Sequence, residues 1–330
     1  MKSITGIKTV CVVGSGTIGL SWAIVFARAG LDVHILENDL QRARTVPERL
    51  AKPLGTLEKV GMTDGLSYED FLARIAVYSK LEEALIDVEY VQECVPEDLE
   101  LKQQIFAELD AAAPAGVILA SSASGYLMTS IAARVDHHAE RCLVVHPTNP
   151  PHIVPLVELV PGAKTANHVI SASLEFMTAL GQEPIVCKKE ILGFVLNRLQ
   201  FALEREAFFL ARNGVASVED IDRSITEGLG LRWALLGPFA VEETNGESIE
   251  EDLRKFNTSM RLLMKDVCQP FDGPDEEDMQ RAIAGVDYVF KGRTHDELLS
   301  YRDESVLAIR RLKSELEIDA DSVDASREEG

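Results

Sequence analysis

The first 37 residues contain the pattern that most constrains the fold. A short β-branched run over residues 8–13 leads into a G-x-G-x-x-G segment over residues 14–19. Apolar residues with helical spacing then continue from Thr17 to Gly30, and a second β-branched run covers residues 32–37. A strand, a glycine turn, a helix and a second strand in this order are typical of a doubly wound α/β sheet.

The glycine segment predicts a binding site for a dinucleotide. Gly14 permits a tight turn, Gly16 lets the backbone approach a pyrophosphate, and Gly19 lets the helix pack on the strand. The N–H groups at the helix start, around Thr17 and Ile18, would then face the phosphates. The alternative, a glycine turn that binds nothing, is disfavoured because strands flank the segment on both sides.

Glu37 ends the second strand, where a carboxylate can accept hydrogen bonds from the ribose hydroxyls of adenosine. A 2′-phosphate at this position would meet a negative charge. The next two residues, Asn38 and Asp39, offer no guanidinium to bind such a phosphate. The predicted cofactor is therefore NAD rather than NADP.

The alternation of strands and helices continues as far as about residue 190. Buried strands are expected over residues 73–78, 88–93, 116–121 and 141–146. A helix is expected from Leu40 to Val60, interrupted near Pro53, and another from Leu99 to Ala112. This part, residues 1–190, is predicted to be a Rossmann-type NAD-binding domain.

No strand pattern follows residue 190, so residues 191–330 are predicted to form an all-helical domain for substrate binding and dimerisation. A long apolar helix is expected over residues 193–213, where Gly214 ends it. Further helices are expected over residues 248–268, 275–288 and 295–317. The polar, acidic tail beyond them is expected to fray.

Composition excludes several classes of function. The chain has 54 acidic and 33 basic residues, a net charge of −21, which repels nucleic acids and anionic lipid surfaces. Five cysteines stand apart from one another, at positions 11, 94, 142, 187 and 268, which predicts neither disulfides nor a metal site. With no signal peptide and no run of apolar residues long enough to span a membrane, the expected location is the cytoplasm.

His146 is the candidate catalytic base. It follows the expected strand 141–146, and open α/β sheets bind their ligands beyond the carboxyl ends of strands. A histidine there can take a hydroxyl proton near neutral pH. Glu158 lies in the apolar run PLVELV, where a buried carboxylate needs a partner, and an imidazole is a suitable one. The alternative for Glu158 is an exposed strand residue.

Two further polar residues are candidates to hold a substrate oxygen. Ser124 lies in the segment LASSASG after an expected strand, where Ser121 and Ser122 compete for the same role. Asn197 lies within the apolar helix GFVLNRLQ, and a buried amide needs hydrogen-bond partners. A hydrogen bond between helices is the alternative for Asn197.

At these residues the chain resembles the 3-hydroxyacyl-CoA dehydrogenase family, over about residues 7–245. The segments that carry the resemblance are GSGTIG, VQECVPEDLELK, SSASG, HPTNPPHIVPLVELVPG and GFVLNRLQ. The resemblance implies a Rossmann domain, a helical domain that pairs into homodimers, and the activity of an NAD-dependent dehydrogenase.

The resemblance also implies roles for individual residues. The catalytic residues would be Ser124, His146, Glu158 and Asn197. Glu37, Glu97 and Lys102 would contact the cofactor, with Asn149 near the nicotinamide. The usual Asn-Thr-Ser of the family reads Ser-Ala-Ser at residues 122–124, and the usual His-Phe-Phe-Asn reads His-Pro-Thr-Asn at residues 146–149. Both departures keep the reacting residues and change their surroundings.

The departures resemble the lambda-crystallin subgroup, which implies L-gulonate 3-dehydrogenase activity on a small hydroxy acid. Arg232, in the segment GLGLRW, is a bidentate donor that suits a substrate carboxylate, and Trp233 would wall the substrate pocket. A structural ion pair is the alternative for Arg232. The L-carnitine dehydrogenases share a similar GLRW segment, but Trp233 and Glu243 alone give little support for a cage around an ammonium group.

The residues are also compatible with a larger substrate and with a role outside catalysis. The basic residues after Glu37 are compatible with a 3-hydroxyacyl-CoA substrate. The hypothesis outside enzymes is a structural, crystallin-like protein with a relic site, although this chain keeps all four of the catalytic residues that the family implies.

Overall fold

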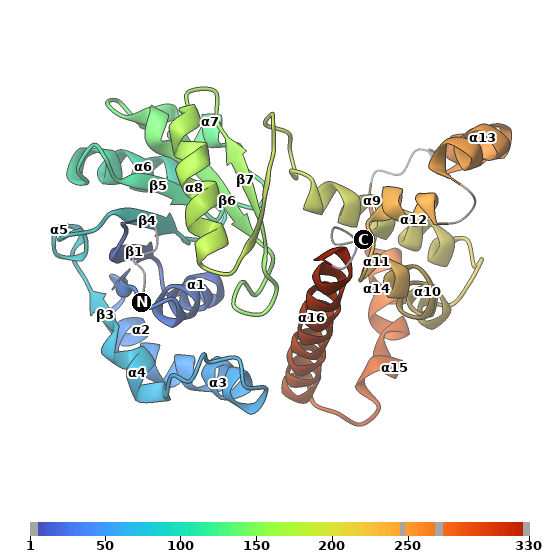
Figure 1. Ribbon diagram of the computed structural model, residues 1–330, viewed down its shortest axis with the longest axis horizontal. Coiled ribbons are helices and arrows are strands. Elements are labelled where there is room, and N and C mark those ends of the chain that lie inside the picture. Colours follow the sequence, from blue (N-terminus) through green and yellow to red (C-terminus); the bar gives the residue numbers. More distant parts are fainter. Residues whose placement is uncertain (1–5, 245–247, 268–272, 326–330) are drawn as a thin grey trace. The chain divides into compact units, whose positions relative to one another are not determined.

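The computed structural model describes residues 6–244, 248–267 and 273–325 (Figure 1). The chain divides into two compact units. The first comprises the residues up to Arg198 together with Arg302–Ala308, and the second comprises Leu199–Tyr301 and the residues from Ile309 onward. The first unit contains a mostly parallel sheet covered by helices, and the second is helical in its described part, which confirms the predicted fold class.

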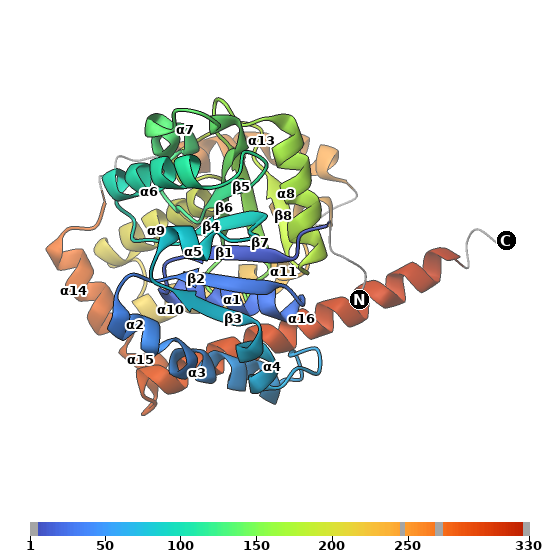
Figure 2. The same cartoon turned by 90° about the vertical axis from the view of Figure 1, so that its left-hand side faces the viewer.

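Eight strands form one sheet in the order β3-β2-β1-β4-β5-β6-β7-β8 (Figure 2). All neighbouring strands run parallel except β6 and β7, which are antiparallel. The strands are β1 (Thr9–Val13), β2 (Asp32–Leu36), β3 (Ile75–Tyr78), β4 (Tyr90–Glu93), β5 (Ile118–Ser121), β6 (Cys142–Pro147), β7 (Leu156–Pro161) and β8 (Glu183–Val186). The connections reverse direction between β1 and β4, where doubly wound sheets open a crevice for ligands.

Side chains alternate between the two faces of the sheet, and a separate core forms on each face. Val10 and Val12 point into one core, whereas Cys11 and Val13 point into the other. The helices of the first unit are α1 (Thr17–Arg28), α2 (Leu40–Arg44), α3 (Val46–Lys59), α4 (Tyr68–Ala73), α5 (Leu81–Ala84), α6 (Leu99–Ala112), α7 (Met128–Ile131) and α8 (Asn167–Ala179), with 3₁₀ turns η1 (Ala132–Arg134) and η2 (Ala139–Arg141).

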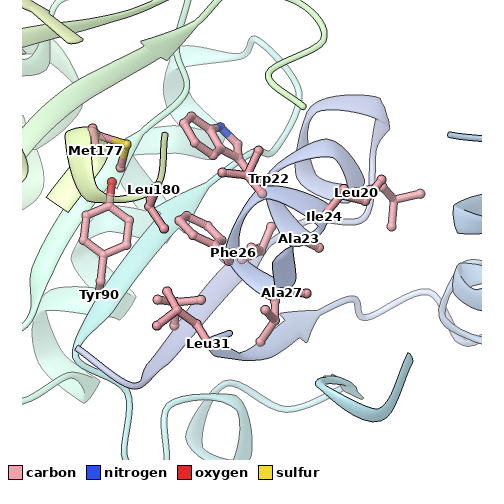
Figure 3. Packing of buried hydrophobic residues seen from close by; sticks show 14 of the residues in the cluster. Leu20, Trp22, Ala23, Ile24, Phe26, Ala27, Leu31, Tyr90, Met177 and Leu180 are labelled. Atoms are coloured by element: carbon pink, nitrogen blue, oxygen red, sulfur yellow. The ribbon is translucent and has the colours of Figure 1, made fainter. Parts of the chain in front are cut away.

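Aromatic rings join α1 to the sheet and to α8. Phe26 stacks on Trp22 with 5.4 Å between ring centroids and on Phe176 with 6.0 Å, and its edge contacts Tyr90. Figure 3 shows Trp22 and Phe26 beside Tyr90, Met177 and Leu180 in this core. All four rings are fully buried. Their packing fixes α1, whose first turn follows the glycine segment, against the sheet.

The second unit consists of helices in the residues that the structure describes. They are the greater part of α9 (Leu196–Arg212), α10 (Val218–Ser224), the π-helical turn η3 (Ile225–Leu229), α11 (Gly230–Trp233), α12 (Pro238–Glu243), α13 (Ile249–Asp266), α14 (Glu276–Gly285), α15 (Asp287–Phe290) and α16 (His295–Ala325), part of which belongs to the first unit. Ser217 accepts a hydrogen bond from the N–H of Asp220 and caps α10.

Several predicted boundaries were wrong. The helix expected from Leu40 to Val60 breaks at Thr45 rather than near Pro53, because a new helix begins at Val46 with Pro47 in its first turn and continues through Pro53. The helix expected from residue 193 begins at Leu196, since Gly193 and Phe194 have the left-handed backbone angles φ +73° and +50°.

Other elements were missed or misjudged in length. Strand β8 was not predicted. The last helix, α16, continues to Ala325 instead of ending near residue 317. Cys268, which was predicted to form no disulfide, lies outside the residues that the structure describes. The other four cysteines are free thiols, as predicted.

Candidate active site

His146 and Glu158 lie directly opposite each other on the antiparallel strands β6 and β7. The His146 Nδ1 and a Glu158 carboxylate oxygen are 2.7 Å apart. The exposed fraction of His146 is 6%, and Glu158 is fully buried. The sequence predicted this pair from two separate observations, and the hairpin between the strands brings the two residues together.

The second oxygen of Glu158 binds the start of α9. The backbone N–H groups of Val195 and Leu196 donate to Glu158 Oε1 at 2.8 and 3.0 Å. These N–H groups belong to the helix start, where no intrahelical partner is available and a negative charge is favoured. The left-handed turn at Gly193 and Phe194 directs them at the carboxylate.

Hydrogen bonds keep the buried Glu158 ionised. Burial alone would raise the pKa of its carboxyl group, but the hydrogen bonds from His146 and from the two backbone N–H groups outweigh that effect and lower the pKa below its usual value. A carboxylate beside Nδ1 fixes the imidazole proton on that nitrogen. The Nε2 of His146 then has a lone pair with which to accept a proton.

Ser124 and Asn197 are also brought together. Asn197 Nδ2 donates to Ser124 Oγ at 2.9 Å and to the Ser124 backbone oxygen at 3.1 Å. Because Ser124 Oγ already accepts a hydrogen bond, its own proton is available for another oxygen. Of the competing serines, Ser121 donates to the buried Glu93 at 2.6 Å, and Ser122 lies within a separate group of hydrogen-bonded side chains.

Lys102 and Glu93 form a buried ion pair, and the exposed Glu97 lies beside it. Lys102 Nζ contacts both oxygens of Glu93, at 2.9 and 3.2 Å, and lies 3.3 Å from Glu97. Burial would lower the pKa of Lys102, but these carboxylates raise it above its usual value. Glu97 also accepts hydrogen bonds from the backbone N–H groups of Ser124 and Gly125, and thereby holds the loop that carries Ser124.

The glycine segment borders a cavity of about 620 Å³. A Cβ atom at Gly19 would lie 2.0 Å from the Gly14 oxygen, and one at Gly14 would lie 3.0 Å from the Cys94 oxygen, whereas Gly16 faces open space. The first turn of α1 carries neither a side-chain cap nor an acidic residue, so its N–H groups suit an anion. These features fit the pyrophosphate of a dinucleotide.

Glu37 lies at the edge of this cavity among several donors. Its carboxylate accepts from Ser15 Oγ at 2.6 Å and from the Asp39 N–H at 3.1 Å, and Arg42 Nε lies 3.4 Å away. Burial would raise the pKa of Glu37, but these donors lower it overall. Arg49 donates to the hydroxyl and the backbone oxygen of Ser15. The guanidinium of Arg42 therefore lies beside the carboxylate, and that of Arg49 lies beside Ser15, which donates to the carboxylate.

The remaining predicted site residues lie elsewhere. Asn149 is exposed on the loop between β6 and β7, three residues after His146. Arg232 and Trp233 lie on α11 in the second unit, both exposed, so their role toward a substrate stays a prediction. Sequence reasoning missed Glu93 and Arg49. Glu93 ends a buried strand, and the reasoning that selected Glu158 could have selected it too.

Two classes of feature are absent from the residues that the structure describes. There, no three His, Cys, Asp or Glu side chains are grouped so that they could hold a metal ion. Among the same residues, no helix combines the length and apolar character that crossing a membrane requires.

We predict that Glu158→Gln will lower the free energy of unfolding by about 1.5–3 kcal/mol at pH 7, because a charged hydrogen-bond network is lost. The folded-state pKa of Glu158 is depressed, so this contribution is present above the ordinary carboxyl pKa and disappears as pH falls through the folded value. Urea unfolding from pH 7 to pH 3 measures the difference. Glu175→Gln, an exposed control on α8, should change stability little, and a pH-independent loss in Glu158→Gln would contradict the assignment.

Two family models together match most of the chain. Residues 9–191 match the NAD binding domain of 3-hydroxyacyl-CoA dehydrogenase, and residues 193–269 match its C-terminal domain. Among curated proteins, the chain is 38% identical over 316 residues to the human lambda-crystallin homolog, covering 93% of this chain and 97% of that protein. It is 37% identical over 318 residues to L-carnitine dehydrogenase from Streptomyces griseus, covering 94% and 91%.

A solved structure has a similar fold over nearly the whole chain. It is 5-formyl-3-hydroxy-2-methylpyridine-4-carboxylic acid 5-dehydrogenase, described as an NAD⁺-dependent dismutase, with a TM-score of 0.80 and 26% identity over 93% of this chain and 99% of that one. Together with the glycine segment, these matches show that the chain belongs to the 3-hydroxyacyl-CoA dehydrogenase family and is an NAD-dependent oxidoreductase that acts on a CH–OH group.

Proposed function

We propose that this enzyme oxidises the 3-hydroxyl group of a small hydroxy acid to a 3-keto acid, with L-gulonate as the first candidate. The observation that carries the proposal is the buried His146–Glu158 pair. The similarity to the human lambda-crystallin homolog supports a small acid. The proposal thus adds a specific substrate to the NAD-dependent oxidation of a CH–OH group that the family carries out.

In the proposed reaction, His146 acts as the general base. Its Nε2 takes the proton of the substrate hydroxyl, the C–H bond breaks, and the carbon–oxygen bond becomes a carbonyl. NAD supplies a hydride acceptor when it is bound. Glu158 keeps the imidazole in the required tautomer and stabilises the imidazolium that forms. Ser124 donates its hydroxyl proton to the substrate oxygen, while Asn197 orients Ser124.

The cofactor would be held by the residues around the cavity. Gly14, Gly16 and the first turn of α1, at Thr17 and Ile18, suit the pyrophosphate, and Glu37 suits the ribose hydroxyls. Gly19 lets α1 approach β1 closely. Asn149 is proposed near the nicotinamide, and Glu97 and Lys102 are proposed as further cofactor contacts. Glu97 also holds the Ser124 loop.

L-carnitine and a 3-hydroxyacyl-CoA are the second candidate substrates, and each has specific support. L-carnitine is favoured by the 37% identity to an L-carnitine dehydrogenase. A 3-hydroxyacyl-CoA such as 3-hydroxybutyryl-CoA is favoured by the family models. Arg232 and Trp233 are proposed as substrate residues, with Arg232 binding a carboxylate.

Turnover of a free acid should be lost in His146→Ala. We expect kcat to fall about 10²–10⁴-fold, the usual contribution of a general base. NADH formation is measured at 340 nm with L-gulonate, L-carnitine, 3-hydroxybutyrate and 3-hydroxybutyryl-CoA. His168→Ala, which replaces an exposed histidine on α8, is the matched control and should keep full activity. Turnover of the CoA ester alone would reject the small-acid substrate, and an active His146→Ala would reject the assigned base.

Replacement of Glu37 should admit NADP. We expect Glu37→Ala to raise the affinity for NADP relative to NAD roughly 10- to 100-fold, the value of one charge-assisted hydrogen bond to Arg42 or Arg49. Isothermal titration with each cofactor measures the ratio. Glu108→Ala removes another carboxylate from the same cavity and should leave the ratio unchanged. Unaltered NADP binding in Glu37→Ala would show that this carboxylate does not set the preference.

We also propose a cytoplasmic homodimer. Isolated cysteines support a reducing compartment. Leu199 and Leu203, one turn apart on α9, expose 60% and 38% of their surface, which supports an apolar interface there.

Sedimentation velocity of the purified protein should give a species of twice the 36.3 kDa chain mass. Leu199→Asp should shift it toward the monomer, because a charge at an apolar interface is costly to bury. Ile86→Asp, which alters an exposed apolar residue of the first unit, should leave the dimer intact. A monomer in the unmodified protein would refute the interface.

A further inference from the structure

A buried amide beneath the active site is not used by the proposed reaction. Gln92 lies next to the end of β4 and is fully buried. Its Nε2 donates to Ser122 Oγ at 2.7 Å and to the Val145 backbone oxygen at 3.3 Å, and its Oε1 accepts from the Tyr90 hydroxyl at 2.7 Å. Because the Val145 oxygen can only accept, it fixes which end of the amide is the nitrogen.

Both acceptors lie next to residues that the mechanism requires. Val145 directly precedes His146 on β6, and Ser122 lies two residues before Ser124. The hydrogen-bonded register of β5 and β6 ends at Ser121 and Val144. Beyond that point, the amide of Gln92 connects the Ser124 loop to the strand that carries His146.

Ser122 extends the connection to the cofactor side of the sheet. Its Oγ also accepts from Trp22 Nε1 at 3.2 Å and lies 3.3 Å from Cys94 Sγ. Trp22 belongs to α1, the helix that follows the glycine segment, and Cys94 lines the cofactor cavity. Because Ser122 Oγ accepts from two N–H donors, its own proton points to the thiol, whose pKa is raised by burial so that it stays neutral.

We propose that Gln92 and Ser122 are positioning residues that set the placement of Ser124 relative to His146 and link both to α1. The amide and the hydroxyl act through the two catalytic groups and do not touch the substrate. A satisfied buried network of this kind allows one arrangement of the strand ends, whereas an apolar replacement leaves the Val145 oxygen and the Tyr90 hydroxyl without this partner. The inference rests on the proposed roles of His146 and Ser124.

The test compares Gln92→Met with Gln182→Met. Gln182 is also buried, at 2% exposed, but it lies in the turn between α8 and β8. Both substitutions keep the approximate volume and remove a buried amide, so stability losses are measured for both by thermal unfolding. We expect kcat to fall roughly 10- to 100-fold in Gln92→Met only, as for a small misplacement of catalytic groups, with unchanged NAD affinity by titration.

Ser122 provides a rescue within the same test. Ser122→Ala should lower kcat as Gln92→Met does, whereas Ser122→Thr keeps the hydroxyl and should retain activity. Trp22 and Trp233 are the two tryptophans of the chain. In a Trp233→Phe background, the fluorescence of Trp22 should therefore shift when Ser122→Ala removes the partner of its indole N–H.

The outcomes distinguish a failure of the positioning inference from a failure of the proposed function. Unchanged kcat in Gln92→Met and Ser122→Ala, with an inactive His146→Ala, overturns the positioning role alone. An equal loss of kcat in Gln182→Met overturns it too, because the effect would then follow from stability. Activity in His146→Ala overturns the proposed base, and the positioning inference with it.

Discussion

The candidate active site depends on the buried carboxylate of Glu158, which has two separate partners. One oxygen of Glu158 holds the imidazole of His146, and the other receives two backbone N–H groups at the start of α9. Leaving such a charge unpaired in the interior would be costly, so each partner supports the position of the other. The start of the helix that carries Asn197 is thereby fixed relative to the strand that carries His146.

On the cofactor side, buried carboxylates are likewise stabilised by several hydrogen-bond donors. Glu37 and Glu93 are both buried carboxylates at the ends of strands, and each is surrounded by donors. Around Glu37 these donors include Ser15 and Arg42, which leaves the carboxylate at the border of the cavity. Around Glu93 the donors are Ser121, Lys102 and the backbone N–H of Val95, and Lys102 also contacts Glu97, which holds the Ser124 loop. These ionic groups therefore hold the loops that border the cavity and the candidate active site.

The similarities to a lambda-crystallin homolog and to an L-carnitine dehydrogenase lead to different proposed substrates for one proposed reaction. The residues proposed for proton transfer lie within the first unit, on β6, β7 and the loop after β5. The proposed substrate residues Arg232 and Trp233 lie on α11 in the second unit. Chemistry and substrate choice are therefore assigned to different parts of the chain.

Local patterns in the sequence were sufficient to predict the fold class, the turn formed by the glycine segment and the His146–Glu158 pair. Glycine spacing and β-branched runs act over a few residues, and a carboxylate in an apolar strand needs a partner wherever the strand lies. The break at Thr45 and the start of α9 were mispredicted, since a proline is compatible with several helix positions and left-handed turns follow from packing. Contacts between distant segments were decided only by the tertiary structure: Arg49 reaches Ser15, and Gln92 reaches both Ser122 and Val145. Such contacts depend on which strands become neighbours, and strand order has no signature in the residues that make the contacts.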